Sequence, residues 1–238
     1  MFKAGKIVQS ITAGILPFPC PLCDDMIADT GPNQLCKNCL DKLHMFREPT
    51  CTGCGGMLDG VLEKCSLCMR EEPRIWNGAF ALFPLTGDGR HLIHLFKYRN
   101  NPEVARAAGQ LAANKLKSSH VTPDIIVPTP LHWTRKLRRG YNQAEMFAEM
   151  ISHFSGIPVE KALTRVKRTK QQAKLNREER KKNLSGAFSL KKGANLKKRD
   201  ILLVDDVMTT GATLHAAAEQ LLANDAGNVY IMVMARRM

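Results

Sequence analysis

Residues 201–214 have the sequence ILLVDDVMTTGATL, which predicts a buried strand, a turn and a helix in that order. The apolar run at 201–204 is typical of a strand that is covered on both faces of a sheet. Two adjacent carboxylates, Asp205 and Asp206, follow this run, and the helix is expected over 212–223. Because ligands of open α/β sheets lie beyond the carboxyl ends of the strands, this stretch indicates both a fold class and a candidate site.

The turn between the strand and the helix carries groups that suit a sugar phosphate. Amides at a helix N-terminus form a cradle for an anion, threonine hydroxyls add donors, and Gly211 permits close approach to the backbone. The two carboxylates would repel a bare phosphate but accept hydrogen bonds from neighbouring sugar hydroxyls. The two carboxylates alone would also fit a metal site or an ordinary helix entry, and the Thr-Thr-Gly turn alone would also fit a simple helix cap. Together they predict a ribose 5-phosphate site made of Asp205, Asp206, Thr209, Thr210, Gly211, Ala212 and Thr213.

Short apolar strands alternate with helices through the second part of the chain. This alternation predicts an α/β fold with a doubly wound, mostly parallel sheet. Strands are expected at 79–85, 124–128, 201–204 and 229–234, and helices around 92–96 and over 102–117, 142–154 and 212–223.

All eight cysteines lie between residues 20 and 68, in four Cys-x-x-Cys pairs. A two-residue gap lets one turn direct both thiolates at a single ion, and two such pairs complete a tetrahedral site. The spacing predicts two structural zinc ions, with disulfides or an iron–sulfur cluster as alternatives. Sequential pairing is preferred over interleaved pairing, although the difference in loop entropy is only about a few tenths of a kcal/mol. The sequential ligand sets are Cys20, Cys23, Cys36 and Cys39, and Cys51, Cys54, Cys65 and Cys68.

Glycines surround the third of these cysteine pairs. We expect Gly53, Gly55 and Gly56 to let backbone amides approach its sulfur atoms.

The formal net charge of +13 on 238 residues is unevenly distributed. Residues 1–75 hold 8 basic and 9 acidic side chains, whereas residues 76–238 hold 27 and 13. We therefore expect a double zinc-ribbon module with a short N-terminal helix over 1–75, and the α/β domain over 76–238. Within the latter, residues 161–199 carry 15 Lys and Arg against two glutamates, which favours a polyanionic partner over a merely solvated face.

The N-terminus loosely resembles a signal peptide, but polar residues interrupt its apolar region and no small-residue cleavage site follows. No apolar run approaches the roughly 18–20 residues that a membrane span needs. We expect a cytoplasmic protein without membrane association.

Several motifs together resemble known families. The 201–214 stretch resembles the loop of type I phosphoribosyltransferases that binds 5-phosphoribosyl 1-pyrophosphate (PRPP). With LFKY at 95–98, VPTPLH at 127–132, RGYNQA at 139–144 and the T-x-x-Q-x-x-L…R-x-x-N-x-x-G-x-F spacing of 169–188, nearly the whole chain is similar to the ComF family. That family is associated with natural competence and the use of external DNA. Thr129 stands where an aliphatic residue is usual, and Trp133 where proline is typical.

The resemblance implies a type I phosphoribosyltransferase-like domain that binds PRPP with Mg²⁺. It implies a pyrophosphate-binding loop at Thr129 and Pro130, and a basic flap that closes over pyrophosphate. The basic residues given a catalytic role on this basis are Arg138, Arg139, Lys167, Arg168 and Lys170.

The family resemblance also implies single-stranded DNA and a helicase-like competence ATPase as partners. Few aromatic residues accompany the basic segment, so we expect contacts mainly to the DNA backbone. The residues assigned to DNA are Trp133, Arg135, Lys136, Lys174, Arg177, Arg180, Lys181 and Lys182. The resulting hypothesis is a DNA-uptake protein that retains a PRPP site. The alternative is an active phosphoribosyltransferase with an unknown acceptor, for which no residue stands out as a general base.

Overall fold

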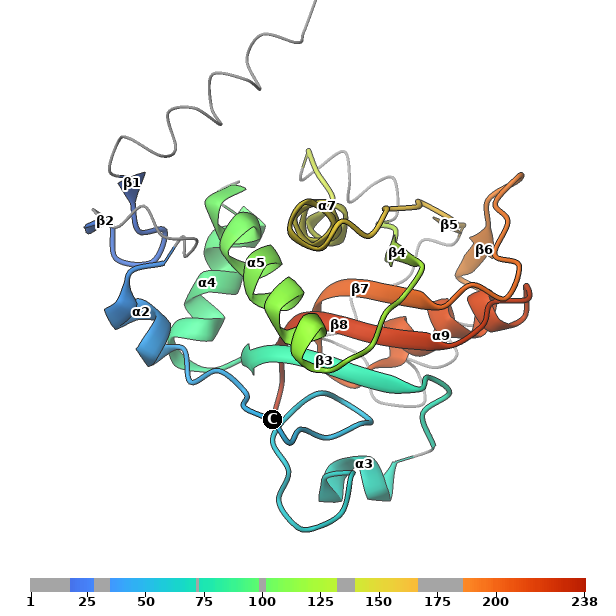
Figure 1. The fold of residues 1–238 in the computed structure, drawn as a ribbon, viewed down its shortest axis with the longest axis horizontal. Coiled ribbons are helices and arrows are strands. Elements are labelled where there is room, and N and C mark those ends of the chain that lie inside the picture. Colours follow the sequence, from blue (N-terminus) through green and yellow to red (C-terminus); the bar gives the residue numbers. More distant parts are fainter. Residues whose placement is uncertain (1–17, 28–34, 72, 99–101, 132–139, 167–185) are drawn as a thin grey trace, which may run out of the picture.

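The computed structural model describes residues 18–27, 35–71, 73–98, 102–131, 140–166 and 186–238 (Figure 1). A sheet of four parallel strands in the order β3-β8-β7-β4 lies at its centre. The predicted α/β class with a mostly parallel sheet is therefore confirmed. The strands are β3 (Gly78–Pro84), β4 (Ile125–Pro128), β7 (Ile201–Met208) and β8 (Val229–Arg236).

Helices cover both faces of this sheet, and each face has its own apolar core. Phe80, Leu82 and Leu202 point into the core beneath α4, α5 and α7, whereas the alternate residues Ala81 and Leu203 point into the core beneath α9. Burial on both faces explains why the strands have continuous apolar sequences. The helices are α4 (Gly87–Tyr98), α5 (Pro102–Ser118), α7 (Gln143–Ser155) and α9 (Ala212–Leu222).

Strand β7 is longer than the sequence predicted. Its pairing with β8 continues from Ile201 opposite Val229 to Met208 opposite Arg236. Asp205 and Asp206 therefore lie within the strand and not after it. The end of the apolar run did not mark the end of the strand, because the backbone pairing of a strand can continue after its side chains become polar.

The connections at the carboxyl ends of β4 and β7 leave toward opposite faces. The chain passes from β4 into α7 on one face, and from β7 into α9 on the other. Since β4 and β7 are neighbours, the two connections diverge where their carboxyl ends meet, which is the position at which doubly wound sheets generally bind ligands.

The residues at its two ends determine where helix α7 begins and ends. The side chain of Asn142 caps it by accepting a hydrogen bond from the amide of Ala144 at 3.1 Å, and Gly156 ends it with a φ of 78°.

A hairpin of β5 (Leu163–Arg165) and β6 (Phe188–Leu190), by contrast, was not predicted. Three-residue strands carry too little alternation to be read from sequence.

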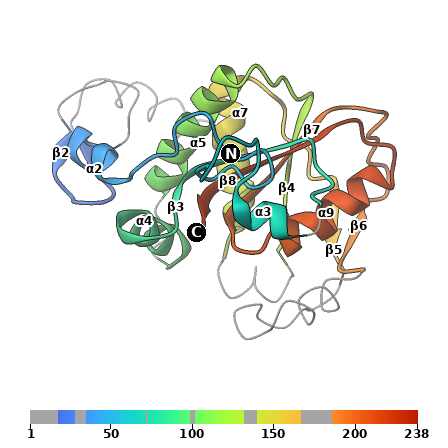
Figure 2. The same ribbon diagram turned by 90° about the horizontal axis from the view of Figure 1, so that it is seen from below.

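The cysteine-rich region lies against both faces of the sheet. Cys39 and Leu43, from its first half, join the core under α4 and α5, whereas Cys54 and Cys68, from its second half, join the core under α9. Figure 1 shows α3 and α5 on opposite sides of the sheet, and in Figures 1 and 2 alike α2 lies beside α4. The short elements here are β1 (Phe18–Pro19), β2 (Met26–Ile27), α2 (Lys37–Lys42) and α3 (Ser66–Arg70).

The chain crosses from one face to the other at the edge strand β3. There the amide of Phe46 donates a hydrogen bond of 2.8 Å to the carbonyl oxygen of Leu82. Because both cores combine residues from the two regions, the boundary between 75 and 76 stays a prediction. Within the described ranges, no helix combines the length and apolar character that crossing a bilayer requires.

Candidate functional site

The cysteines form two groups of four, each made of sequence neighbours. One group contains Cys20, Cys23, Cys36 and Cys39, the other Cys51, Cys54, Cys65 and Cys68, and the sulfur atoms of each group lie within 4.8 Å of one another. In a tetrahedral site with Zn–S bonds of about 2.3 Å, sulfur atoms lie about 3.8 Å apart. The distances here are 3.7 Å from Cys23 to Cys36 and 3.8 Å from Cys54 to Cys65. Both donor sets fit a closed, structural zinc site, and the grouping is the sequential one.

Backbone amides and thiol chemistry support this interpretation. The amide of Cys39 donates to the sulfur of Cys36 at 3.4 Å, and the amide of Cys65 to the sulfur of Cys51 at 3.3 Å. Hydrogen bonds from Cys54 and Cys68 lower the pKa of Cys51, and the same interaction with Cys51 raises the pKa of Cys68. A cation bound among these four thiols would favour the thiolate at every position.

The glycines of the third pair serve more than one kind of contact, and the amide of Gly53 donates to the sulfur of Cys51, as expected. A Cβ on Gly53 would lie 3.1 Å from the sulfur of Cys68, but a Cβ on Gly55 would lie 2.4 Å from the amide nitrogen of Ala81 in β3. With its φ of 69°, Gly55 lets the ribbon pack directly on the backbone of the sheet. The amide of Gly55 donates to the carbonyl oxygen of Cys51 at 2.7 Å, and the expected approach of amides to sulfur at this glycine stays a prediction.

A second polar cluster lies at the carboxyl ends of β4 and β7. Thr129, the residue after β4, is 4% exposed, and its amide donates to the carbonyl oxygen of Val204 at 2.9 Å. Its hydroxyl donates to the carboxylate of Asp205. Thr129 therefore uses both of its donors within the protein and joins the two strands, while Pro130 beside it is half-buried.

The paired carboxylates differ in their surroundings. Burial, followed by the neighbouring charge of Asp206, raises the pKa of Asp205 to about 7. Asp206 faces Lys97 of α4, whose ammonium lies 2.9 Å from its carboxylate. Lys97 belongs to the LFKY motif, but no sequence pattern indicates its partner, which lies 109 positions later in the chain.

The turn after β7, residues 209–213, changes direction at Gly211. With a φ of 78°, this glycine is the N-cap residue of α9. The Thr210 hydroxyl accepts a hydrogen bond of 3.4 Å from the amide of Ala212, and Thr209, Thr210 and Thr213 are all half-buried. The positive φ of Gly211 lets the chain turn from β7 into α9, which places the N-terminus of α9 just beyond the end of the strand.

Two arginines contact the carbonyl oxygens of this turn. Arg74 donates to the carbonyl of Thr210 at 3.1 Å, and Arg236 donates to the carbonyl of Thr209 at 2.7 Å. A Cβ on Gly211 would lie 3.1 Å from Arg74 and 3.4 Å from the ring of Trp76. Sequence reasoning missed both arginines, because they are far from the turn along the chain.

Many predicted residues lie outside the described ranges. Among the basic residues of 161–199 that are described, several have structural partners. Arg165 is 8% exposed with its guanidinium 5.3 Å from the Phe188 ring, Lys161 pairs with Glu145 at 3.0 Å, and Arg199 pairs with Glu160 at 2.5 Å. The residues outside the described ranges are Trp133, Arg135, Lys136, Arg138, Arg139, Lys167, Arg168, Lys170, Lys174, Arg177, Arg180, Lys181 and Lys182.

The exposed lysines of the same segment lie apart from the turn. Lys197 and Lys198 precede β7, so they lie at the opposite end of this strand from residues 209–213. Exposed Lys191 and Lys192 follow β6. The basic residues expected beside the phosphate site end at Lys182, so these four lysines do not test that expectation.

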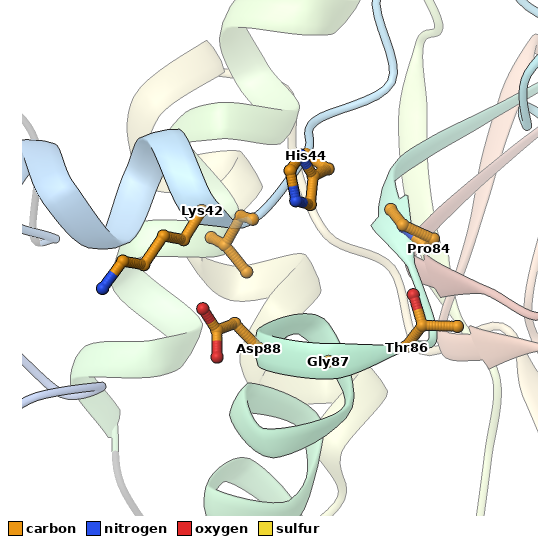
Figure 3. Close-up of a pocket in the computed structure, with 7 residues that line it drawn as sticks. Lys42, His44, Pro84, Thr86, Gly87 and Asp88 are labelled. Atoms are coloured by element: carbon orange, nitrogen blue, oxygen red, sulfur yellow. The ribbon is translucent and has the colours of Figure 1, made fainter.

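A separate hollow of about 200 Å³ lies where the first ribbon meets the end of β3. Figure 3 shows Lys42 and His44 from the ribbon side, and Thr86 and Asp88 from the segment that starts α4. Since β8 separates β3 from β7 in the sheet, this hollow is distinct from the cluster at Asp205 and Asp206.

Comparisons with known proteins agree with this architecture. The family described as "Double zinc ribbon domain" matches residues 11–70, and "Phosphoribosyl transferase domain" matches residues 96–238. Competence protein F of Haemophilus influenzae is 33% identical over 86% of this chain and 91% of its own length. DNA utilization protein YhgH of Escherichia coli K12 is 29% identical (93% and 98%), and competence protein ComFC of Bacillus subtilis is 29% identical (88% and 90%). A double zinc ribbon joined to a phosphoribosyltransferase domain, with such relatives along most of its length, makes the chain a member of the ComF family.

Proposed function

We propose that this chain acts in the uptake of external DNA, binds single-stranded DNA and holds PRPP at the carboxyl ends of β4 and β7. One observation carries the PRPP assignment: Asp205 and Asp206 lie in the second half of β7, and the turn that follows this strand begins α9 at Gly211. Acceptors for sugar hydroxyls and donors for a phosphate thereby lie one turn apart. The names of the relatives, which refer to competence and DNA utilization, support the role in DNA uptake.

Each group in the site has a proposed task. The amides of residues 209–213 and the threonine hydroxyls bind the 5-phosphate. Asp206, held by Lys97, accepts from ribose hydroxyls, and Asp205 does so with the help of Thr129. Mg²⁺ bound with the pyrophosphate would neutralise part of its charge. The basic residues proposed for pyrophosphate are Arg138, Arg139, Lys167, Arg168 and Lys170.

Calorimetry with PRPP and Mg²⁺ tests this site on the full zinc-loaded chain. Asp205→Asn/Asp206→Asn should abolish PRPP binding, because the NH2 group of each amide donates where a carboxylate oxygen accepts from a ribose hydroxyl. Glu219→Gln, on the exposed face of α9, is the matched control and should bind like the native protein. Native affinity in the double variant would contradict the site, as would native protein that does not bind PRPP.

Single-stranded DNA is the proposed macromolecular ligand, and a helicase-like ATPase the proposed protein partner in the cytoplasm. The concentration of positive charge in 161–199 supports backbone contacts with DNA. The logarithm of the DNA binding constant should fall with the logarithm of salt concentration, with a slope of roughly −0.7 per phosphate neutralised. Replacing Lys174, Arg177, Arg180, Lys181 and Lys182 by Gln should make that slope shallower. A salt-independent affinity would contradict this electrostatic interface.

Transfer of phosphoribose is the second candidate function, favoured by the match of residues 96–238 to the phosphoribosyltransferase family. An acceptor would form a bond to C1 of the ribose while pyrophosphate leaves with the bonding electrons. Release of pyrophosphate from PRPP and Mg²⁺, measured across a panel of nitrogen and oxygen acceptors, tests it. Sustained turnover that Asp205→Asn/Asp206→Asn abolishes would establish the enzyme, and its absence with every acceptor would favour a binding role.

A further inference from the structure

Arg74 links the second zinc ribbon to the turn at 209–213. Its side chain is only 10% exposed, it forms an ion pair with Glu71, and its guanidinium lies 5.3 Å from the centre of the Trp76 ring. From this enclosed position Nη1 donates to the carbonyl oxygen of Thr210 at 3.1 Å. A guanidinium fixed by an ion pair, a ring and packing can hold a backbone carbonyl in one orientation.

Arg236 acts on the preceding peptide. It is 2% exposed, and Nη1 donates to the carbonyl oxygens of Thr209, at 2.7 Å, and of Arg237. A Cβ on Gly56 of the ribbon would lie 3.6 Å from Cγ of Arg236 and 3.5 Å from the sulfur of Cys54. The ribbon therefore packs against both arginines that hold the turn.

The two hydrogen bonds determine where the amides of the turn point. In a trans peptide the N–H lies opposite the C=O of the preceding residue. When the carbonyls of Thr209 and Thr210 point toward the arginines, the N–H groups of Thr210 and Gly211 point away from them. These are two of the donors proposed for the 5-phosphate, and the guanidinium charges behind them favour an anion in front.

The position of Arg74 depends in turn on the cysteine knuckle of residues 51–54. The indole nitrogen of Trp76, on which Arg74 stacks, donates to the carbonyl oxygen of Gly53 at 3.1 Å. A Cβ on Gly53 would lie 3.1 Å from the sulfur of Cys68 and 3.6 Å from Cγ of Arg74. The knuckle supplies two of the four sulfur ligands of this site, so a metal bound there fixes the surface against which Arg74 and Trp76 pack.

We propose that Arg74 is a positioning residue, and that the zinc site at Cys51, Cys54, Cys65 and Cys68 prepares the 209–213 turn to bind a sugar 5-phosphate. The inference rests on the proposed PRPP site and adds a dependence of that site on the ribbon. Loss of this zinc releases Arg74, leaves the carbonyl of Thr210 unheld and weakens phosphate binding.

Arg74→Ala tests the proposal in the full zinc-loaded chain, with Arg70→Ala as the control. Arg70 carries the same charge on the same ribbon but is exposed on α3. Arg74→Ala should weaken binding of PRPP and of ribose 5-phosphate by about tenfold each, the loss of one charge-assisted hydrogen bond. Binding of inorganic pyrophosphate, which lacks the 5-phosphate, should not change. Arg70→Ala should match the native protein for all three ligands, and Arg74→Lys should recover part of the loss.

Amide hydrogen exchange of residues 209–213 without ligand provides a second readout, with zinc content measured in parallel. Exchange should be faster in Arg74→Ala than in Arg70→Ala while both retain two zinc ions. Cys68→Ser, which removes one ligand of the second site, should accelerate exchange of the same segment. A folded Cys68→Ser protein that has lost this zinc and exchanges like the native chain would overturn the metal dependence.

The outcomes separate this inference from the proposed function. If native protein fails to bind PRPP, the proposed function falls, and the exchange comparison still decides the role of Arg74. Equal exchange and equal ligand affinity in Arg74→Ala and Arg70→Ala would overturn the inference even where native protein binds PRPP tightly.

Discussion

The ammonium of Lys97 lies 2.9 Å from the carboxylate of Asp206 and joins the last turn of α4 to the end of β7. Both side chains are largely covered, with exposures of 22% for Lys97 and 14% for Asp206. The lysine offsets one of two neighbouring negative charges at a site proposed to bind a polyanion.

Removal of this lysine should weaken PRPP binding. We expect Lys97→Met to lower the affinity by about tenfold, because Asp206 is left uncompensated beside the charged ligand. The lysine of the Lys161–Glu145 pair, 45% exposed, provides the control Lys161→Met. This change should alter the affinity less than twofold, because the acidic partners of Lys161 lie on α7 and not at the proposed site. Equal calorimetric affinities for native protein and Lys97→Met would contradict a role for Lys97 at the ligand.

The raised pKa of Asp205 predicts a pH-dependent stability. Folding raises the pKa of this carboxyl to about 7 from its ordinary value of 3.8, so the folded chain binds the proton more tightly than the unfolded chain. Its contribution to the free energy of unfolding is therefore complete below pH 3.8, falls as the pH rises toward 7, and stays low above it. Asp205→Asn removes this titration and should stabilise the protein relative to native more at pH 8 than at pH 5.

Urea unfolding of the native protein and Asp205→Asn at both pH values measures this difference. The same stability difference at pH 5 and pH 8 would mean that Asp205 does not titrate in this interval.

Each four-cysteine group should hold one zinc ion. The native chain should release two zinc ions to a chelator, and Cys39→Ser and Cys68→Ser should each release one, since a structural site needs its four ligands. Both variants should also unfold at lower temperature. One zinc ion in the native chain, or two in either variant, would contradict two independent closed sites.

Gly55 should be far more sensitive to substitution than Gly60. Gly55→Ala places a Cβ 2.4 Å from the amide nitrogen of Ala81 at a φ of 69°, whereas a Cβ on Gly60 meets nothing within 4 Å. We expect Gly55→Ala to lower the free energy of unfolding by more than about 2 kcal/mol, and Gly60→Ala to change it by less than about 0.5 kcal/mol. Denaturant titration of both variants tests the comparison; similar effects would show that the ribbon does not need its close approach to β3.

Sequence alone predicted the features that depend on local pattern. The apolar run and turn at 201–214, the helix over 142–154 and the Cys-x-x-Cys pairs each combine neighbouring residues whose chemistry specifies a local structure. Their positions in the structure agree with those expectations, apart from the longer β7.

The missed features depend on contacts between distant residues. Arg74 and Thr210 are 136 positions apart, and neither motif nor periodicity relates them. The contact between Arg236 and Thr209 could likewise not be predicted from the sequence, because an arginine at the end of a strand is usually exposed. Only the packing of the ribbon on the sheet brings these side chains to the turn.

The order of strands in the sheet has a consequence for biosynthesis. β8, the last strand in the chain, lies between β3 and β7, which are made earlier. Until residues 229–236 leave the ribosome, β3 and β7 lack the neighbour that joins them, and Arg236 is not yet present to hold the carbonyl of Thr209. The nascent chain therefore exposes unpaired strand edges late into its synthesis, and it gains its ligand site only after translation has passed the final strand.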